Sequence, residues 1–187
     1  MMTLDKRLFF FLFIFLTSCN SSDNLTNESK YHFPTISGST MGTTYTVKYG
    51  TTKKSNEEIV KNKNMIEKIL QDINMQMSTY ITESEISKFN SNQSTDWMII
   101  SDDFAYVVEA SFKYHNISDG LYDITVMPIV NLWGFGPEKF LDNPSPAKID
   151  SVLAFVGQDL IQIEGNRIRK KDSRVQIDLS SIAKGYA

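Results

Sequence analysis

The sequence has few of the residues that make covalent cross-links or structural metal sites. Its 187 residues include one cysteine, Cys19, and two histidines, His32 and His115, which lie far apart in the chain. A single cysteine cannot form an intramolecular disulfide, and a structural zinc site needs about four Cys or His ligands. These counts exclude both a disulfide scaffold and a structural zinc centre.

The chain also has no excess of positive charge. The chain carries 19 Lys and Arg residues against 22 Asp and Glu residues, a formal net charge of −3 at pH 7. Proteins that bind nucleic acid neutralise its phosphates with a basic surface, so we expect no nucleic acid partner. The composition is 41% hydrophobic and 22% charged, which is ordinary for a folded domain and excludes disorder as the main state.

Conventional nucleotide-binding and hydrolase motifs are missing as well. The chain has no Gly-x-Gly-x-x-Gly, no Gly-x-x-x-x-Gly-Lys-Ser/Thr and no Gly-x-Ser-x-Gly sequence. With only two histidines available, a Ser-His-Asp triad is also poorly supported. The sequence therefore gives no support for a dinucleotide fold, a P-loop or a triad hydrolase.

No apolar run is long enough to span a bilayer, but a shorter run lies near the N-terminus. Lys6 and Arg7 precede nine consecutive apolar residues at 8–16, whereas a spanning helix needs about 20. Leu16-Thr17-Ser18-Cys19 closes the run, in an arrangement that resembles a bacterial lipoprotein signal peptide. An ordinary signal peptide, with Cys19 unmodified, is the alternative.

The lipoprotein resemblance implies three N-terminal regions. Residues 1–18 would be the signal peptide, Cys19 would be lipidated, and the polar residues 19–30 would form a flexible tether. We therefore expect an exported protein, lipid-anchored to a membrane and facing the periplasm or the outer surface.

Residues 31–187 are predicted to form one α+β domain with two long helices. Ser55 and Glu58 make a capping box before apolar residues at helical spacing, which predicts a helix over about 56–76. Ser101 introduces a second apolar stripe and predicts a helix over about 102–116.

Short strands are predicted around these helices. The alternation of apolar and polar residues favours an antiparallel three-stranded meander over 161–163, 167–169 and 175–179. Residues 121–133, which include Pro128, favour an irregular or edge segment. Because the strands do not alternate with helices in regular βαβ units, we expect antiparallel sheets beside the two long helices.

Four clusters of small and polar residues lie between these elements. Each alone is typical of a turn or a helix cap. Together they offer backbone that can approach a ligand, side chains that stack on rings, and carboxylates that bind hydroxyl groups or a hard cation. The clusters are Ser37–Thr44, Met77–Tyr80, Asp119–Asp123 and Asp178–Gly185.

The clusters and their flanks occur in the order of a known family. The chain reads Gly-Ser-Thr-Met-Gly-Thr-Thr-Tyr, then Met-Ser-Thr-Tyr followed by Ser-Glu-Ile-Ser-Lys-Phe-Asn, then Asp-Gly-Leu-Tyr-Asp-Ile-Thr-Val-Met-Pro-Ile-Val-Asn-Leu-Trp-Gly-Phe-Gly, and finally Asp-Leu-Ser-Ser-Ile-Ala-Lys-Gly-Tyr-Ala. Over about residues 36–187 it resembles the ApbE family of FAD:protein FMN transferases. The resemblance implies an ApbE-like α+β fold. It also implies Mg²⁺-dependent transfer of FMN from FAD to a Ser or Thr hydroxyl of a target protein, with release of AMP.

The resemblance also implies the site residues. Ser181 would be a Mg²⁺ ligand. The catalytic residue and the other Mg²⁺ ligands would lie beyond Ala187, so we expect a domain truncated at its C-terminus and inactive by itself. The implied FAD contacts are Met41, Tyr80, Leu121, Tyr122, Asp123, Asp178 and Lys184.

The implied partners are FAD, Mg²⁺ and acceptor proteins with a flavinylated Ser or Thr, such as subunits of redox-driven membrane pumps. Two alternatives remain open from the sequence. One is a Mg²⁺-dependent FAD pyrophosphatase, in which water replaces the acceptor hydroxyl. The other is a lipoprotein that binds flavin without turnover.

Overall fold

The computed structural model describes residues 30–137 and 143–187. Cys19, the predicted signal peptide and the tether up to residue 29 lie outside the described residues. The α+β class predicted from the sequence is confirmed. In chain order the elements are β1 (Thr35–Thr40), β2 (Thr43–Lys48), α2 (Asn56–Met77), α3 (Glu85–Ser91), β3 (Met98–Ile99), α4 (Asp102–Ile117), η2 (Ile124–Val126), α5 (Met127–Leu132), α6 (Pro146–Leu153), η3 (Gln158–Leu160), β4 (Ile161–Ile163), β5 (Arg167–Lys170) and α7 (Ser180–Tyr186).

The two long helices begin where their caps predict. The Ser55 hydroxyl accepts a hydrogen bond from the Glu58 amide at 3.3 Å, and α2 follows. The Ser101 hydroxyl accepts from the Phe104 amide at 3.4 Å at the start of α4. Each bond satisfies an N–H group that would otherwise lack a partner in the first turn.

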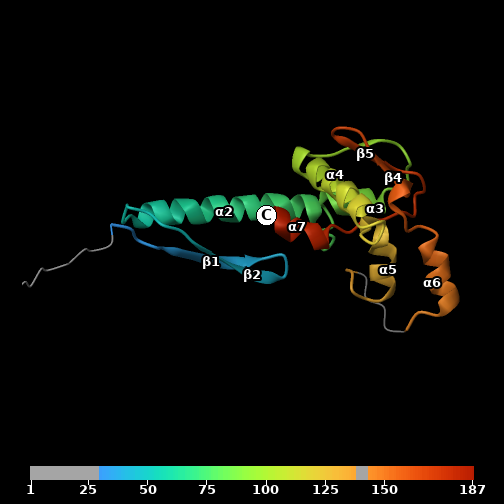
Figure 1. Cartoon of the computed structure of the whole chain (residues 1–187), viewed down its shortest axis with the longest axis horizontal. Helices are drawn as coiled ribbons and strands as arrows, with labels where there is room; N and C mark the ends of the chain where they lie inside the picture. Colours follow the sequence, from blue (N-terminus) through green and yellow to red (C-terminus); the bar gives the residue numbers. More distant parts are fainter. Residues whose placement is uncertain (1–29, 138–142) are drawn as a thin grey trace, which may run out of the picture.

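The core lies where α3, α4 and the end of α2 meet a small antiparallel sheet of order β3-β5-β4 (Figure 1). Ile168, in the central strand β5, pairs with Met98 of β3 and Ile163 of β4. Among the described residues no helix is long and apolar enough to cross a membrane. The fully buried side chains of this core include Ile86, Phe104, Val108, Ile168, Ile177 and Leu179.

The predicted third strand of the meander is wrong. Val175, Ile177 and Leu179 are fully buried, as the alternation indicated, but residues 175–179 form no strand and β3 completes the sheet instead. The backbone of this segment bonds elsewhere, for example from the Asp178 amide to the Ile124 carbonyl at 2.7 Å. Burial alone produced the strand-like pattern.

Residues 121–133 also differ from the prediction, because part of this irregular or edge segment is helical. The Asp123 carboxylate accepts from the Thr125 amide at 2.7 Å and caps η2, and α5 follows directly. Pro128 lies in the first turn of α5, where a missing N–H costs no intrahelical hydrogen bond.

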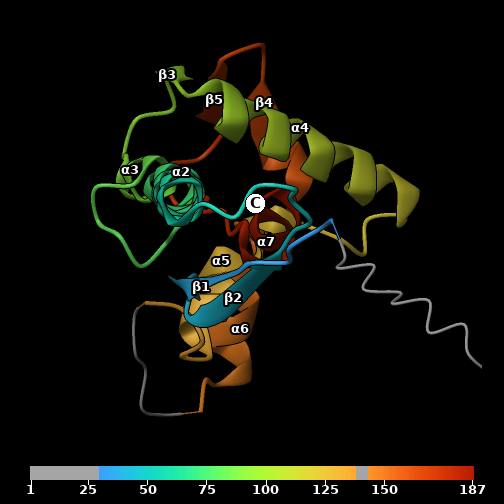
Figure 2. The ribbon, with the colours of Figure 1, turned by 90° about the vertical axis from the view of Figure 1, so that its left-hand side faces the viewer.

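Strands β1 and β2 form an antiparallel hairpin that lies along α2 (Figures 1 and 2). A two-residue turn, Met41-Gly42, joins the strands, and its φ values are 49° and 71°. Positive φ at both central positions is the geometry of a tight hairpin turn, and it is unusual for methionine. The turn lies near the C-terminal end of α2.

Candidate functional site

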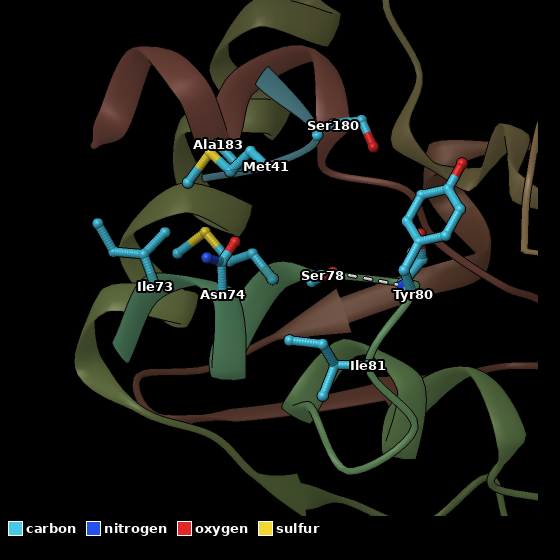
Figure 3. Close-up of a pocket in the computed structure, with 11 residues that line it drawn as sticks. Met41, Ile73, Asn74, Ser78, Tyr80, Ile81, Ser180 and Ala183 are labelled. Atoms are coloured by element: carbon cyan, nitrogen blue, oxygen red, sulfur yellow. Dashed lines mark hydrogen bonds between the residues drawn. The ribbon is translucent and has the colours of Figure 1, made fainter. Parts of the chain in front are cut away.

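A cavity of about 500 Å³ opens where the hairpin turn, the C-terminal end of α2, the loop after α2 and the first turn of α7 meet (Figure 3). Its volume is in the range of small-molecule sites. None of its lining side chains is charged. The lining residues are Met41, Gly42, Ile73, Asn74, Met77, Ser78, Thr79, Tyr80, Ile81, Ser180 and Ala183.

The hairpin turn is held onto α2 at the edge of this cavity. The Asn74 side-chain amide donates to the Thr40 hydroxyl at 2.9 Å, one residue before the turn. The positive φ of Met41 is a strained conformation that persists only where the surroundings enforce it, and such positions cluster at functional sites. Figure 3 shows the Met41 side chain beside Ala183, across the cavity from Ile73 and Asn74.

Tyr80 supplies the aromatic ring of the cavity. Its amide donates to the Ser78 hydroxyl at 3.3 Å, and its own hydroxyl donates to the Phe135 carbonyl at 3.0 Å. Although both ends of the residue are fixed, the residue is 68% exposed. A fixed and accessible ring face can stack on a planar ligand.

Helix α7 distributes its residues among three cavities. Ser180 and Ala183 line the first, whereas Ser181 lines a second of about 800 Å³ against α4, and Lys184 lines a third of about 370 Å³ against the hairpin and α2. The helical period of 3.6 residues separates these positions. Ser181 and Lys184 therefore do not meet at one cavity.

Tyr122 connects the third sequence cluster to α7. Its hydroxyl shares a hydrogen bond with the Ser181 hydroxyl at 3.1 Å, and its carbonyl lies 2.8 Å from Nδ1 of His115, which donates to it. Its neighbour Leu121 is 91% exposed and does not line the first cavity.

The second cavity has its own aromatic and acidic wall. The Tyr186 hydroxyl donates to Asp103, and this bond raises the pKa of Tyr186 to about 12. The Tyr106 and Tyr186 rings pack with centroids 5.6 Å apart. The raised pKa means that the phenol of Tyr186 stays protonated further into the alkaline range than an ordinary tyrosine.

The carboxylates of Asp123 and Asp178 accept hydrogen bonds from other residues of the chain. Asp123 accepts from the Thr125 amide and hydroxyl, at 2.7 and 2.5 Å, and from the Gln158 amide at 2.9 Å. Asp178 accepts from the amide and the hydroxyl of Ser180, at 2.8 and 2.6 Å, where α7 begins. In this structure both carboxylates stabilise turns.

Of the seven predicted FAD contacts, the structure brings Met41 and Tyr80 to the first cavity. The other five do not line it, so contact between them and FAD stays a prediction: Leu121, Tyr122, Asp123, Asp178 and Lys184. Three lining residues lie outside the four sequence clusters and were missed: Ile73, Asn74 and Ile81. The helical period was the available signal for Ile73 and Asn74, because they lie four and three residues before Met77.

The residues present do not form a magnesium site by themselves. Within the described ranges, no group of three or more His, Cys, Asp or Glu side chains could hold a metal ion. The Ser181 hydroxyl, the predicted ligand, already bonds with Tyr122. Mg²⁺ requires about six oxygen ligands in octahedral geometry, so the described residues alone do not fit the ion.

Comparison with known proteins identifies the family. The profile of the ApbE family matches residues 41–187, most of the chain and all four sequence clusters except the first residues of the first. The chain belongs to the ApbE family. The resemblance seen in the motifs is thereby confirmed.

Two relatives carry the same activity name. The chain is 43% identical over 164 residues to the FAD:protein FMN transferase of Haemophilus influenzae. This match covers 81% of this chain and 45% of that protein. It is 38% identical over 155 residues to that of Vibrio cholerae, with the same coverage. The chain thus spans about half the length of the curated relatives it matches.

Solved ApbE structures confirm the ApbE-like fold. The flavin transferase ApbE from Vibrio cholerae matches with a TM-score of 0.78 and 36% identity. The apo form of the Pseudomonas stutzeri flavinyl transferase ApbE matches with a TM-score of 0.75 and 34% identity. Each match covers 83% of this chain and 50% of the other.

Proposed function

We propose that this chain forms the flavin-binding part of an FAD:protein FMN transferase. The observation that carries the proposal is the first cavity, where two separate family motifs bring Met41 and Tyr80 together in an uncharged lining. Relatives named for this activity support it. In the reaction, a Ser or Thr hydroxyl of the acceptor attacks the phosphorus of the FMN half of FAD and loses its proton. The bond from that phosphorus to the bridging oxygen breaks, and AMP leaves with the bridging oxygen as part of its phosphate.

The lining suits the flavin ring better than the diphosphate. The Tyr80 ring can lie against a planar heterocycle, while Asn74 and Ser78 offer amide and hydroxyl groups to its polar edge. An uncharged cavity gives a dianionic diphosphate no compensation. Lys184, on a neighbouring face of α7, is the cation closest in sequence to this lining. We propose that its ammonium binds the phosphates of FAD.

Magnesium dependence and AMP release belong to this proposal. In a transfer assay, addition of EDTA is expected to abolish both the release of AMP and the covalent labelling of the acceptor. Labelling that continues in EDTA would contradict the proposed magnesium dependence and would leave the proposed flavin site unaffected.

We also propose that the protein is exported and lipid-anchored at Cys19, and that its acceptors lie on the same side of the membrane. In a bacterial host, mass spectrometry should find a lipidated Cys19 as the first mature residue, and Cys19→Ala should leave unprocessed precursor. An unmodified Cys19 in an uncleaved chain would contradict the proposal.

FAD binding is the first test of the cavity. Titration of FAD with the purified 187-residue chain should quench flavin fluorescence, and Tyr80→Ala should weaken binding up to about tenfold because the stacking surface is lost. Phe33→Ala is the matched control, since it removes an exposed aromatic ring remote from the cavity lining. If wild-type protein does not bind FAD, the proposal fails.

Transfer is tested in a chimera that appends the second half of the Haemophilus influenzae relative to this chain. With FAD, Mg²⁺ and a Thr-bearing acceptor, we expect AMP and covalent flavin fluorescence in a gel, and neither from the 187-residue chain alone. Release of free FMN without labelling would favour the pyrophosphatase, and bound FAD without AMP would favour the binding protein.

A further inference from the structure

The segment 175–179 buries alternate residues, yet it pairs with no strand of the described residues. Val175, Ile177 and Leu179 are fully buried in the core. Backbone N–H and C=O groups in such a position need partners, because a buried polar group without one is destabilising. The Val175 and Asp178 amides bond to the backbone carbonyls of Asp172 and Ile124, whereas Ile177 finds its partner in a side chain.

Asn90, in α3, pairs with the backbone of this segment. Its Oδ1 accepts from the Ile177 amide at 2.8 Å, and its Nδ2 donates to the Ile177 carbonyl at 2.8 Å. A carboxamide carries the same donor and acceptor as a peptide group. Asn90 therefore reproduces the pair of hydrogen bonds that a neighbouring antiparallel strand would make.

Lys170 links the backbone around Asn90 to the same buried segment. Its buried ammonium donates to the carbonyls of Phe89, Asn90 and Val175, at 3.0, 3.4 and 3.2 Å. The end of α3 and the start of the buried segment are thus joined twice. The position of Ile177 relative to α3 is thereby determined by polar contacts as well as by packing.

The position of Ile177 affects the cavity, because Ser180 of the cavity lining lies only three residues later. Asp178 follows Ile177, and its carboxylate bonds to the amide and the hydroxyl of Ser180, the first residue of α7. Ser180 lines the first cavity. A displacement of Ile177 would therefore move the start of α7 and one wall of the cavity.

We propose that Asn90 is a positioning residue that sets the start of α7 against the flavin cavity. Asn90 ends the sequence motif Ser-Glu-Ile-Ser-Lys-Phe-Asn, which contributes no residue to the cavity lining. The positioning role would give this motif a function outside the cavity. The effect on FAD binding rests on the proposed function, whereas the effect on the backbone does not.

Hydrogen exchange of the full chain tests the backbone effect. In Asn90→Ala the Ile177 amide should exchange about tenfold faster, as expected for one lost hydrogen bond. The Ile100 amide, bonded to the Asn166 carbonyl at 3.0 Å and outside the segment, is an internal reference. The matched control is Asn92→Ala, because the Asn92 side chain accepts only a local bond from the Ser94 amide at 2.9 Å and should leave Ile177 unchanged.

FAD titration tests the effect on the cavity, at a temperature where circular dichroism shows each variant folded. Asn90→Ala should weaken FAD binding about fivefold or more, and Asn92→Ala should leave it unchanged. Asn90→Asp keeps the acceptor for the Ile177 amide but loses the donor, so it should preserve protection of that amide and lie between wild type and Asn90→Ala in affinity.

The outcomes are separable. If wild type binds no FAD, the proposed function fails, and the exchange of Ile177 still decides whether Asn90 holds the segment. If wild type binds FAD and Asn90→Ala binds equally well, or exchanges Ile177 at the wild-type rate, the positioning role is overturned. Should Asn90→Ala not fold, wild-type FAD affinity in Asn90→Asp would overturn it.

Discussion

Two regions of the molecule carry similar apolar patterns but bury them to different extents. The core end comprises α3, α4, the three-stranded sheet and segment 175–179. The arm comprises the β1–β2 hairpin and the N-terminal half of α2, and it extends to one side in Figure 1. Phe104 and Val108 of α4 are fully buried, whereas Val60 of α2 is 58% exposed.

The difference shows that apolar periodicity predicts a helix but not its burial. Along α2 only Ile73 and Met77, at the end next to the core, are buried. The exposed part relies on local interactions, which include the Ser55 cap and the Lys68–Asp72 ion pair at 2.9 Å. Such exposed pairs contribute about 0.5 kcal/mol or less, so the arm is stabilised mainly by the helix itself and its contacts with the hairpin.

The largest expected difference in stability is between two Phe→Ala variants, one in the core end and one in the arm. Phe104→Ala removes a fully buried ring and should lower the free energy of unfolding by about 3–5 kcal/mol. Phe33→Ala, which removes a ring that is 58% exposed beside the hairpin, should lower it by less than about 1 kcal/mol. Urea denaturation followed by circular dichroism measures both. Equal losses would refute the comparison.

A second prediction concerns the charge buried at the core end. Burial lowers the pKa of Lys170 to about 8, although the nearby Asp172 carboxylate raises it. The unfolded chain keeps the ordinary value of 10.5 and so binds more protons between these values. Stability from this group should therefore rise with pH through that window, by about 2 kcal/mol between pH 7 and pH 9.5. Below pH 8 the unfavourable contribution is fully present.

Lys170→Met isolates this effect, because it keeps the length of the side chain and removes the titrating group. The difference in unfolding free energy between wild type and Lys170→Met, measured at several pH values, should change by the stated amount in favour of wild type as pH rises. Lys171→Met, at an exposed position one residue later, is the control and should show no such trend. A flat difference for Lys170→Met would contradict the assignment.

The sequence predicted those parts of the fold that depend on local chemistry. The caps at Ser55 and Ser101 and the apolar stripes behind them predict α2 and α4 within one residue at each end. The strand predicted at 175–179 failed because its partner is the side chain of Asn90, far away in sequence. Alternation reports burial on one face, and it cannot tell a strand from an irregular segment whose backbone bonds to other partners.

The candidate site was predictable to the extent that motifs mark it. Met41 and Tyr80 were named from the sequence and line the first cavity. The distribution of Ser180, Ser181 and Lys184 over three cavities depends on where α7 begins and how it is rotated, which the motif does not specify. The engagement of Asp123 by Thr125 and Gln158 required the tertiary structure, since Gln158 lies far along the chain.

The smallest expected effect completes the comparison, because it applies one substitution to both long helices. In α2, Val60→Ala removes an exposed β-branched side chain and inserts a better helix former, so stability should change by less than about 0.5 kcal/mol, in the stabilising direction. In α4, Val108→Ala leaves a cavity in the core and should lower stability by about 2 kcal/mol. Thermal and urea unfolding of the two variants provide the measurement. A loss of more than 1 kcal/mol for Val60→Ala would mean that the arm is covered in solution, because only a buried valine loses that much on truncation.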